Sequence, residues 1–203
     1  MKSIEKLQTL LPLGYLFLVT LGIIKESVFF HQIGINILEY SSIMDILISP
    51  IATLTSNPIV LAAIIMMFAF YVYLPKLLYK HHHKKWVEKA FELKKIKEES
   101  LDEVTLKNRF VEIAIKNLCV ILLSFFLGFG IAGGHYTSQR IKDNKLKYGY
   151  KLNYSTGESE IIYKIGSNSV YYFYVAKGSS LVKIVPVNAV KSIELIKNNI
   201  PKN

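Results

Sequence analysis

Three long apolar blocks constrain the fold of this chain more than any other feature of its sequence. The first, residues 10–30, begins with LLPLGYLFLVTLGII, which carries no charge. The second, residues 58–79, is free of charge until Lys76, and the third, residues 113–134, carries only Lys116 near one end. A helix of about 20 apolar residues crosses the roughly 30 Å of hydrocarbon in a bilayer. We therefore predict transmembrane helices over 10–30, 58–79 and 113–134.

The segment 33–54 decides whether the chain has three or four spans. On a helix, its apolar residues fall on one side, and its polar residues gather on the other: Glu39, Ser42, Asp45, Ser49 and Thr53. Pro50 is expected to kink this amphipathic helix or to end its first part. The segment either lies flat in the membrane interface, enters as a re-entrant element, or turns its polar side to a water-filled cavity between subunits. A full crossing instead gives four spans.

Two charges, Lys25 and Glu26, directly follow the first uncharged run. Neighbouring residues on a helix point about 100° apart, so we expect these side chains not to pair, and Lys25 to be neutralised by Glu39 or Asp45. Two interpretations remain open: the side chains extend to the lipid headgroups, or they belong to a polar cluster that lines a pore or forms a switch. The candidate residues of that cluster are Lys25, Glu26, His31, Glu39, Ser42, Asp45 and Ser49.

Small residues in the third block predict close helix packing. Ser124, Gly128 and Ala132 recur every four residues, and Gly130 with Gly134 forms a GxxxG pattern. We expect these residues to cover one side of the helix and to let another backbone approach. The neighbour is either the first span or a second copy of the chain, so self-association is one of the two expectations.

A charged helical link, residues 80–110, joins the second and third blocks. Its lysines adjoin the second span, and basic flanks of this kind are usually cytoplasmic, which places the N-terminus inside and the C-terminal region outside. That region holds eleven Lys and Arg against four acids from residue 135 onward, so charge alone does not decide its side. The sequence SLDE is a capping box that starts a second helix at Leu101, and this helix can run unbroken into the third span. The triplet His81–His83 lacks the ligand spacing of a metal site.

Residues 135–203 differ in composition from the rest and predict a small β module. Five short apolar and aromatic runs alternate with the turn sequences STGE, GSNS, KGSS and PVN. We expect a strongly bent antiparallel sheet or barrel of the SH3-like or Sm-like kind. Its aromatics and lysines suit either a sheet core with a docking role or the binding of nucleotide or RNA. The candidate ligand-binding residues are Lys147, Tyr150, Lys164, Tyr172 and Tyr174.

The sequence shows no catalytic constellation. The five histidines are His31, the triplet and His135, and none accompanies a serine or cysteine nucleophile in a recognisable context. We therefore predict a non-enzymatic protein without a cofactor or a metal ion.

The N-terminal stretch LGYLFLVTLGIIKESVFFHQIGINILEYSSIMDILISPI, together with the size and layout of the chain, carries a resemblance. The chain is similar to the small multi-pass membrane accessory proteins encoded beside the RNA-guided RNA nuclease of type VI-B CRISPR loci, and to uncharacterised bacterial membrane proteins of the same plan. The resemblance implies an accessory or effector role in antiviral defence at the bacterial cytoplasmic membrane, modulating the nuclease or acting on the bilayer. It assigns no functional residues.

Two functions remain open at this point. In the first, the protein is a homo-oligomeric membrane effector whose amphipathic segment lines or gates a pore. In the second, it is a membrane-anchored binding module whose basic, aromatic β domain docks a protein, a nucleotide or RNA.

Overall fold

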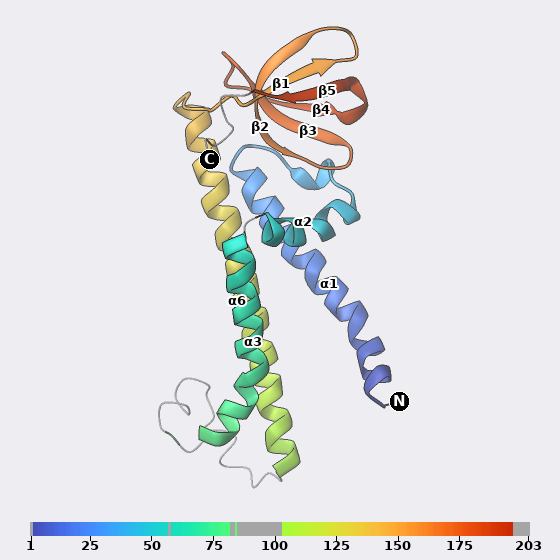
Figure 1. Cartoon of the computed structure of the whole chain (residues 1–203), viewed down its shortest axis with the longest axis vertical. Coiled ribbons are helices and arrows are strands. Elements are labelled where there is room, and N and C mark those ends of the chain that lie inside the picture. The colour runs from blue at the N-terminus through green and yellow to red at the C-terminus, as the bar shows by residue number, and fades with distance from the viewer. Residues whose placement is uncertain (1, 57, 82–83, 85–102, 197–203) are drawn as a thin grey trace. The chain divides into compact units, whose positions relative to one another are not determined.

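A computed structural model of the chain describes residues 2–56, 58–81, 84 and 103–196, with the side chains of the first helix described from Pro12 onward (Figure 1). Within these residues the helices are α1 (Lys2–His31), the short 3₁₀ helix η1 (Ile37–Glu39), α2 (Ile43–Thr55), α3 (Pro58–His81) and α6 (Glu103–Lys142). The strands are β1 (Tyr150–Tyr154), β2 (Ser159–Ser167), β3 (Tyr171–Ala176), β4 (Val182–Pro186) and β5 (Val190–Leu195). A second 3₁₀ helix, η2 (Val187–Ala189), lies between β4 and β5.

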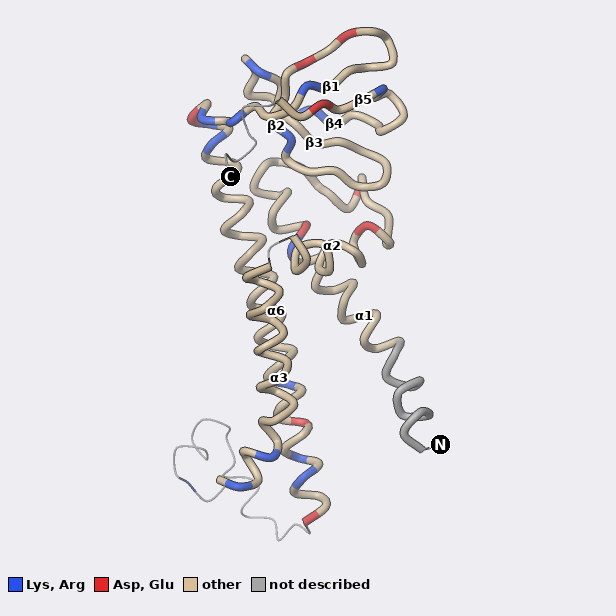
Figure 2. The backbone as a smooth tube through the Cα atoms, in the orientation of Figure 1, with Lys and Arg blue, Asp and Glu red and all other residues tan. Residues whose placement is uncertain are grey.

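Three of the helices are long and apolar enough to cross a membrane: α1 from Pro12 onward, α3 and α6. They contain the three predicted spans, and α6 continues without a break through the third, as expected. Figure 2 shows long stretches of α3 and α6 without charged residues. The helix α2 has only 13 residues and is shorter than a span. Over the residues described, three helices are therefore long and apolar enough to span a bilayer, and α2 is too short.

The chain divides into two compact units. One consists of residues 1–50 and 126–203, and the other of residues 51–125. In the second unit, Leu74 and Leu78 of α3 form a buried cluster with Phe110 and Ala114 of α6. The end of α3 thus packs on the start of α6, so the two helices run antiparallel. The predicted domain boundary at residue 134 falls within α6.

A glycine ends α1. Gly34 has a φ of +84°, its N–H donates to the carbonyl of His31 at 3.0 Å, and the N–H of Ile35 donates to the carbonyl of Phe30 at 3.0 Å. This is a Schellman motif, which satisfies the last carbonyls of a helix and needs a left-handed residue, most often glycine. The chain therefore leaves the helical conformation at this point, and the prediction of one amphipathic helix over 33–54 is wrong for residues 33–42.

The helix α2 begins instead at Ile43, where Ser42 and Asp45 form a capping box. The Ser42 N–H donates to the Asp45 carboxylate at 3.0 Å, and the Asp45 N–H donates to the Ser42 hydroxyl at 3.1 Å. Such reciprocal bonds satisfy two N–H groups that a helix start leaves unpaired. The helix then runs through Pro50 to Thr55, so the proline does not end it.

The five strands form one antiparallel sheet in the order β4-β3-β2-β1-β5, which confirms the predicted strands. The turns after β1 and β3 place Gly157 and Gly178 at φ of +95° and +84°, which explains the glycines in STGE and KGSS. One face of the sheet carries its own core, in which Leu152 and Ile162 are fully buried. Register shifts interrupt the β1–β5 and β2–β3 ladders, and such bulges bend a sheet.

Candidate functional site: the junction of the sheet with the first membrane helix

The other face of the sheet packs against the end of α1. Phe173 of β3 joins Phe30 of α1 in one buried cluster, with ring centroids 4.9 Å apart. The ring of Tyr40, directly after η1, meets Tyr171 edge-on at 5.5 Å. The remaining members of the cluster come from α1, the loop after it, η1 and the strands: Phe29, Ile35, Ile37, Ile165, Val182 and Ile184. Burial of this much apolar and aromatic surface stabilises the contact, so the sheet has no free second face over β2, β3 and β4.

The turn between β2 and β3 adds polar contacts to this junction. The Asn168 side-chain amide donates to the carbonyl of Tyr40 at 2.8 Å. Ser169 donates to the Asp45 carboxylate through its N–H and its hydroxyl, both at 3.0 Å. Together with the two groups of Ser42, the carboxylate therefore accepts four hydrogen bonds, and its second set of partners comes from the sheet. Asp45 thus caps α2 and fastens the sheet to it at the same time.

These hydrogen bonds also set the charge of Asp45. Burial of the carboxyl raises its pKa, but the hydrogen bonds from Ser42 and Ser169 outweigh burial, so the pKa lies below its ordinary value. The group is consequently ionised at neutral pH, the state in which it accepts all four bonds.

A second polar contact involves Lys25 and Glu26, more than one helical turn before α1 ends at His31. The Lys25 ammonium pairs with the Glu26 carboxylate at 2.6 Å, and the two side chains are only 16% and 17% exposed. Ser49 of α2 bridges them: its hydroxyl accepts from Lys25 at 3.1 Å and donates to Glu26. The prediction that Lys25 and Glu26 cannot pair is wrong. Their Cβ atoms diverge, but both side chains are long enough to meet at the Ser49 hydroxyl.

The predicted polar cluster therefore separates into distinct contacts. Glu39 accepts a hydrogen bond from Asn36 at 2.7 Å and Asp45 faces Ser169, so neither of the expected carboxylates neutralises Lys25. His31 is exposed in the last turn of α1. Of the seven residues proposed for one cluster, the structure brings together Lys25, Glu26 and Ser49, and separately Ser42 and Asp45.

Glycines let the helices of this unit approach closely. A Cβ atom at Gly22 of α1 would clash with the carbonyl oxygen of Ile46 in α2. A Cβ atom at Gly130 of α6 would lie 2.8 Å from the carbonyl oxygen of Lys25, and one at Gly134 would lie 2.7 Å from that of Phe29. The GxxxG pattern thus packs on α1 of the same chain, and increasing numbers on both helices show that they run parallel.

The other small residues of α6 lie elsewhere. Ser124, Gly128 and Ala132 are exposed, and nothing lies within 4 Å of a Cβ atom built at Gly128. Gly128 and Gly130 are two residues apart and therefore point about 200° apart on a helix. The prediction that all five small residues share one side is wrong, because the two patterns fall on opposite sides.

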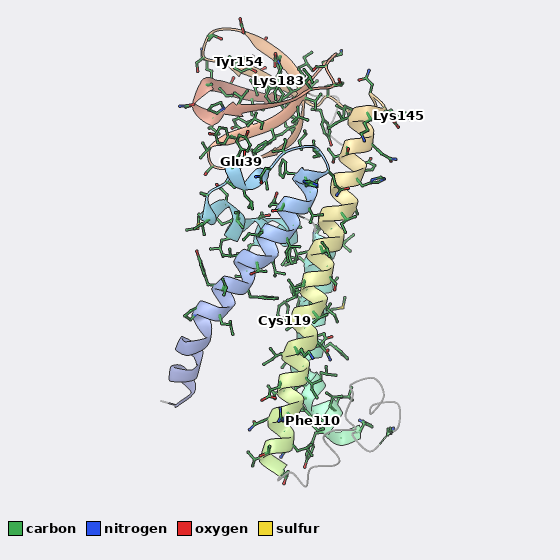
Figure 3. All side chains as sticks on the ribbon, turned by 180° about the vertical axis from the view of Figure 1, so that it is seen from behind. Glu39, Phe110, Cys119, Lys145, Tyr154 and Lys183 are labelled. Carbon is green, nitrogen blue, oxygen red and sulfur yellow. The ribbon has the colours of Figure 1, made fainter. Side chains whose placement is uncertain are left out.

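Within the sheet, the candidate ligand residues are largely used by the core. Tyr174 is fully buried, and its hydroxyl bonds to Tyr154 and, at 3.1 Å, to Glu160, whose other oxygen pairs with Lys183 at 2.5 Å (Figure 3). Burial raises the pKa of Tyr174 strongly. This ring is therefore closed to stacking by a base.

The other four candidates keep some exposure. The Lys164 ammonium lies 5.5 Å from the centre of the Tyr172 ring, and Tyr150 and Tyr172 pack against the core that contains Leu152. Lys147 is exposed ahead of β1. Four of the five candidate residues thus belong to the packing of the sheet or border on it, as the interpretation of the aromatics as sheet core expects.

Parts of the predicted site lie outside the described residues. They are His82, His83 and the capping box that begins at Ser100. Over the residues that the structure does describe, no group of three or more His, Cys, Asp or Glu side chains is placed to hold a metal ion.

Sequence reasoning missed the sheet–helix junction, although two signals point to it. The strand β3, YYFYVA, is apolar or aromatic at every position, which is typical of a strand buried on both faces. Phe29 and Phe30 continue α1 beyond its charged pair, where a simple anchor has no need of apolar residues. Comparison of the chain with protein-family models, with curated proteins and with solved structures found no match.

Proposed function

We propose that the chain is a non-enzymatic docking protein of the bacterial cytoplasmic membrane, in which three spans hold a small SH3-like or Sm-like β module on the outer side for assembly with a partner. The observation that carries the proposal is the junction itself. The module is fastened to α1 and α2 by a buried aromatic cluster and by the bonds of Asn168 and Ser169, as an anchor that positions a binding domain requires.

The junction supports three crossings over four. With three, residues 32–56 and the sheet lie on one side of the membrane. With a fourth crossing at 33–54, Tyr40 and Asp45 would lie within the bilayer, and the end of α1 and the sheet would lie on opposite sides. The bonds from Asn168 to Tyr40 and from Ser169 to Asp45 require the same side.

The charge distribution supports an outer location for that side. Residues 32–57 contain no Lys or Arg, whereas residues 76–109 contain ten. Short loops rich in Lys and Arg remain in the cytoplasm. We therefore infer that the link between α3 and α6 lies inside and that the short loop and the sheet lie outside.

The strand order supports a small bent barrel. The strands β1 to β4 follow one another as a meander, and β5 returns to pair with β1 after the single turn of η2. The bulges in the β1–β5 and β2–β3 ladders add the bend that such a sheet needs to curl over its own core. With the β2–β3 turn used by the junction, the β1–β2 and β3–β4 turns at the opposite strand ends remain for a partner, and Leu181 in the latter is 73% exposed.

Labelling with a membrane-impermeant maleimide tests this topology. In a Cys119→Ser background, Leu181→Cys reports the sheet and Lys84→Cys, at the exposed end of the link, reports the opposite side. We expect labelling of Leu181→Cys in intact spheroplasts and of Lys84→Cys only in inverted vesicles. The reverse pattern would overturn the outer location, and labelling of both positions from one side would overturn three crossings.

A pore remains the competing proposal, and the charged pair of α1 is the observation in its favour. A pore needs polar side chains turned to water, whereas Ser49 and Asp45 bind Lys25, Glu26 and Ser169 of the same chain. We expect dye-loaded vesicles that contain the full chain to leak no faster than empty ones. Leakage that Glu39→Leu with Asp45→Leu abolishes, in protein that still inserts, would favour the pore.

The proposal includes the defence role that the resemblance implies, restricted to an action at the membrane or the envelope. An outer module has no access to a cytoplasmic nuclease or to RNA, so a role in immunity would act through the membrane or the envelope. Phage plaque counts on cells with and without the chain, each with the same RNA-guided nuclease, test this role. Equal counts would contradict it.

A further inference from the structure

The helix α2 presents an apolar face that the described part of the chain leaves open. Ile43, Met44 and Ile48 are 66%, 59% and 51% exposed. On the inner side, Ile46 and Pro50 are buried, and the polar Asp45 and Ser49 bond to other parts of the chain. Polar residues therefore point inward and apolar residues outward, the reverse of an amphipathic helix on a water-facing surface.

The level of α2 relative to the hydrocarbon can be read from the spacing of charges on the spans. On α1, Lys25 lies nineteen positions after Lys6, which is about 28 Å of helix. On α6, Gly130 lies eighteen positions after Glu112, or about 27 Å along the helix, and Lys116 between them is near enough to the Glu112 end to extend to the headgroups. Both lengths match the roughly 30 Å of the hydrocarbon. Gly130 packs directly against Lys25, so both helices place the boundary on the sheet side at the same level.

Two contacts fix α2 at this boundary. Ile46 lies against Gly22, and the Ser49 hydroxyl accepts from the Lys25 ammonium at 3.1 Å. A charged pair is also far cheaper at the edge of the hydrocarbon than at its centre. The helix α2 is therefore held where headgroups meet acyl chains. The next span agrees with this level, because α3 begins at Pro58, three residues after the end of α2, and its first charge, Lys76, comes eighteen positions later.

We propose that α2 lies in the membrane interface on the sheet side and that Ile43, Met44 and Ile48 insert among the acyl chains of that leaflet. The occupant of the open face is lipid hydrocarbon, because the boundary of two spans coincides with this helix. Residues 32–57 contain no Lys or Arg, so apolar insertion and not attraction to anionic headgroups holds the face in place. The proposal does not depend on which side of the membrane the sheet occupies.

Spin-label accessibility tests the proposal on the full chain in vesicles of phosphatidylethanolamine and phosphatidylglycerol. A nitroxide is attached to Ile48→Cys in the Cys119→Ser background, and its relaxation by oxygen, which enters lipid, is compared with that by a water-soluble nickel chelate. Ile65→Cys on α3, an exposed position in the middle of a span, is the lipid control, and Leu181→Cys is the water control. If Ile48→Cys does not yield monodisperse protein, Met44→Cys probes the same face.

We expect the label at Ile48 to favour oxygen over nickel as the label at Ile65 does, at a shallower depth. A nickel-accessible label like that at Leu181 would overturn the proposal, because the face would lie in water. Protection from both reagents would overturn it as well, because protein, such as a second copy of the chain, would then cover the face.

Discussion

The pair Lys25 and Glu26 shows how two adjacent charges are accommodated on a membrane helix. Each is mostly buried, so replacing either Lys25 with Met or Glu26 with Gln leaves its neighbour short of a partner. We expect each single change to lower the free energy of unfolding by about 1–3 kcal/mol. Thermal unfolding in detergent measures this.

The double replacement Lys25→Met with Glu26→Gln is the matched comparison for this pair. It removes both charges together, so we expect it to cost less than the sum of the two single changes. Simple additivity would show that the two side chains do not interact in the folded protein.

Asp45 gives the junction a dependence on pH. The pKa of Asp45 is lower in the folded protein than in the unfolded chain, where it is about 3.9. The ionised carboxylate therefore contributes its full stabilisation above about pH 3.9, and this stabilisation is lost as the pH falls through the pKa of the folded state. Asp45→Asn removes this contribution, which we expect to be about 1 kcal/mol at neutral pH. Melting temperatures of the parent and the variant should differ by a constant amount from neutral pH to about pH 5 and converge below about pH 4. A difference that persists unchanged at acid pH would contradict this role.

At the scale of elements, α6 contains one glycine that packs against α1 and one that is exposed, and replacing each with alanine distinguishes their roles. A methyl group at Gly130 would meet the Lys25 carbonyl oxygen at 2.8 Å, so Gly130→Ala should push α1 and α6 apart and lower the melting temperature. Gly128→Ala meets nothing and should be neutral or slightly stabilising, since alanine favours helix over glycine by about 1 kcal/mol.

The same pair of variants reports on self-association. If Gly128→Ala changes the oligomeric state in light scattering while Gly130→Ala does not, the exposed small residues pack on a second copy. An unchanged state in both variants would leave the GxxxG pattern with its intrachain role only.

The elements themselves were largely predictable from sequence. Long uncharged runs fix the spans, because the bilayer imposes their length, and alternating turn chemistry fixes all five strands. The prediction of a helix over residues 33–42 was wrong because Gly34 ends α1 and Ser42 caps the start of α2. These local signals outweigh the helical spacing of apolar residues. The pairing of α1 with the sheet was not predicted, because it joins segments far apart in the chain that no local pattern connects.

At the scale of the whole molecule, the junction makes the sheet and the first membrane helix one cooperative structure. Phe173 is buried between them, so Phe173→Ala should cost about 3–5 kcal/mol and loosen both the sheet and the loop 32–42. Hydrogen exchange of the full chain in detergent would show faster exchange in both segments. Leu195→Ala, at a position 56% exposed on β5, is the control and should change neither. Faster exchange in the sheet alone would mean that the two parts are not coupled.

The distance in sequence across the junction has a consequence for biogenesis. The bond from Asn168 to Tyr40 joins residues 128 positions apart, and that from Ser169 to Asp45 joins residues 124 apart. The first membrane helix and its aromatic end therefore leave the ribosome long before their partner strands exist. Phe29 and Phe30 have no cover from β2, β3 and β4 until those strands are made. We therefore expect a chain cut short before β3 to be degraded faster in cells than the full chain.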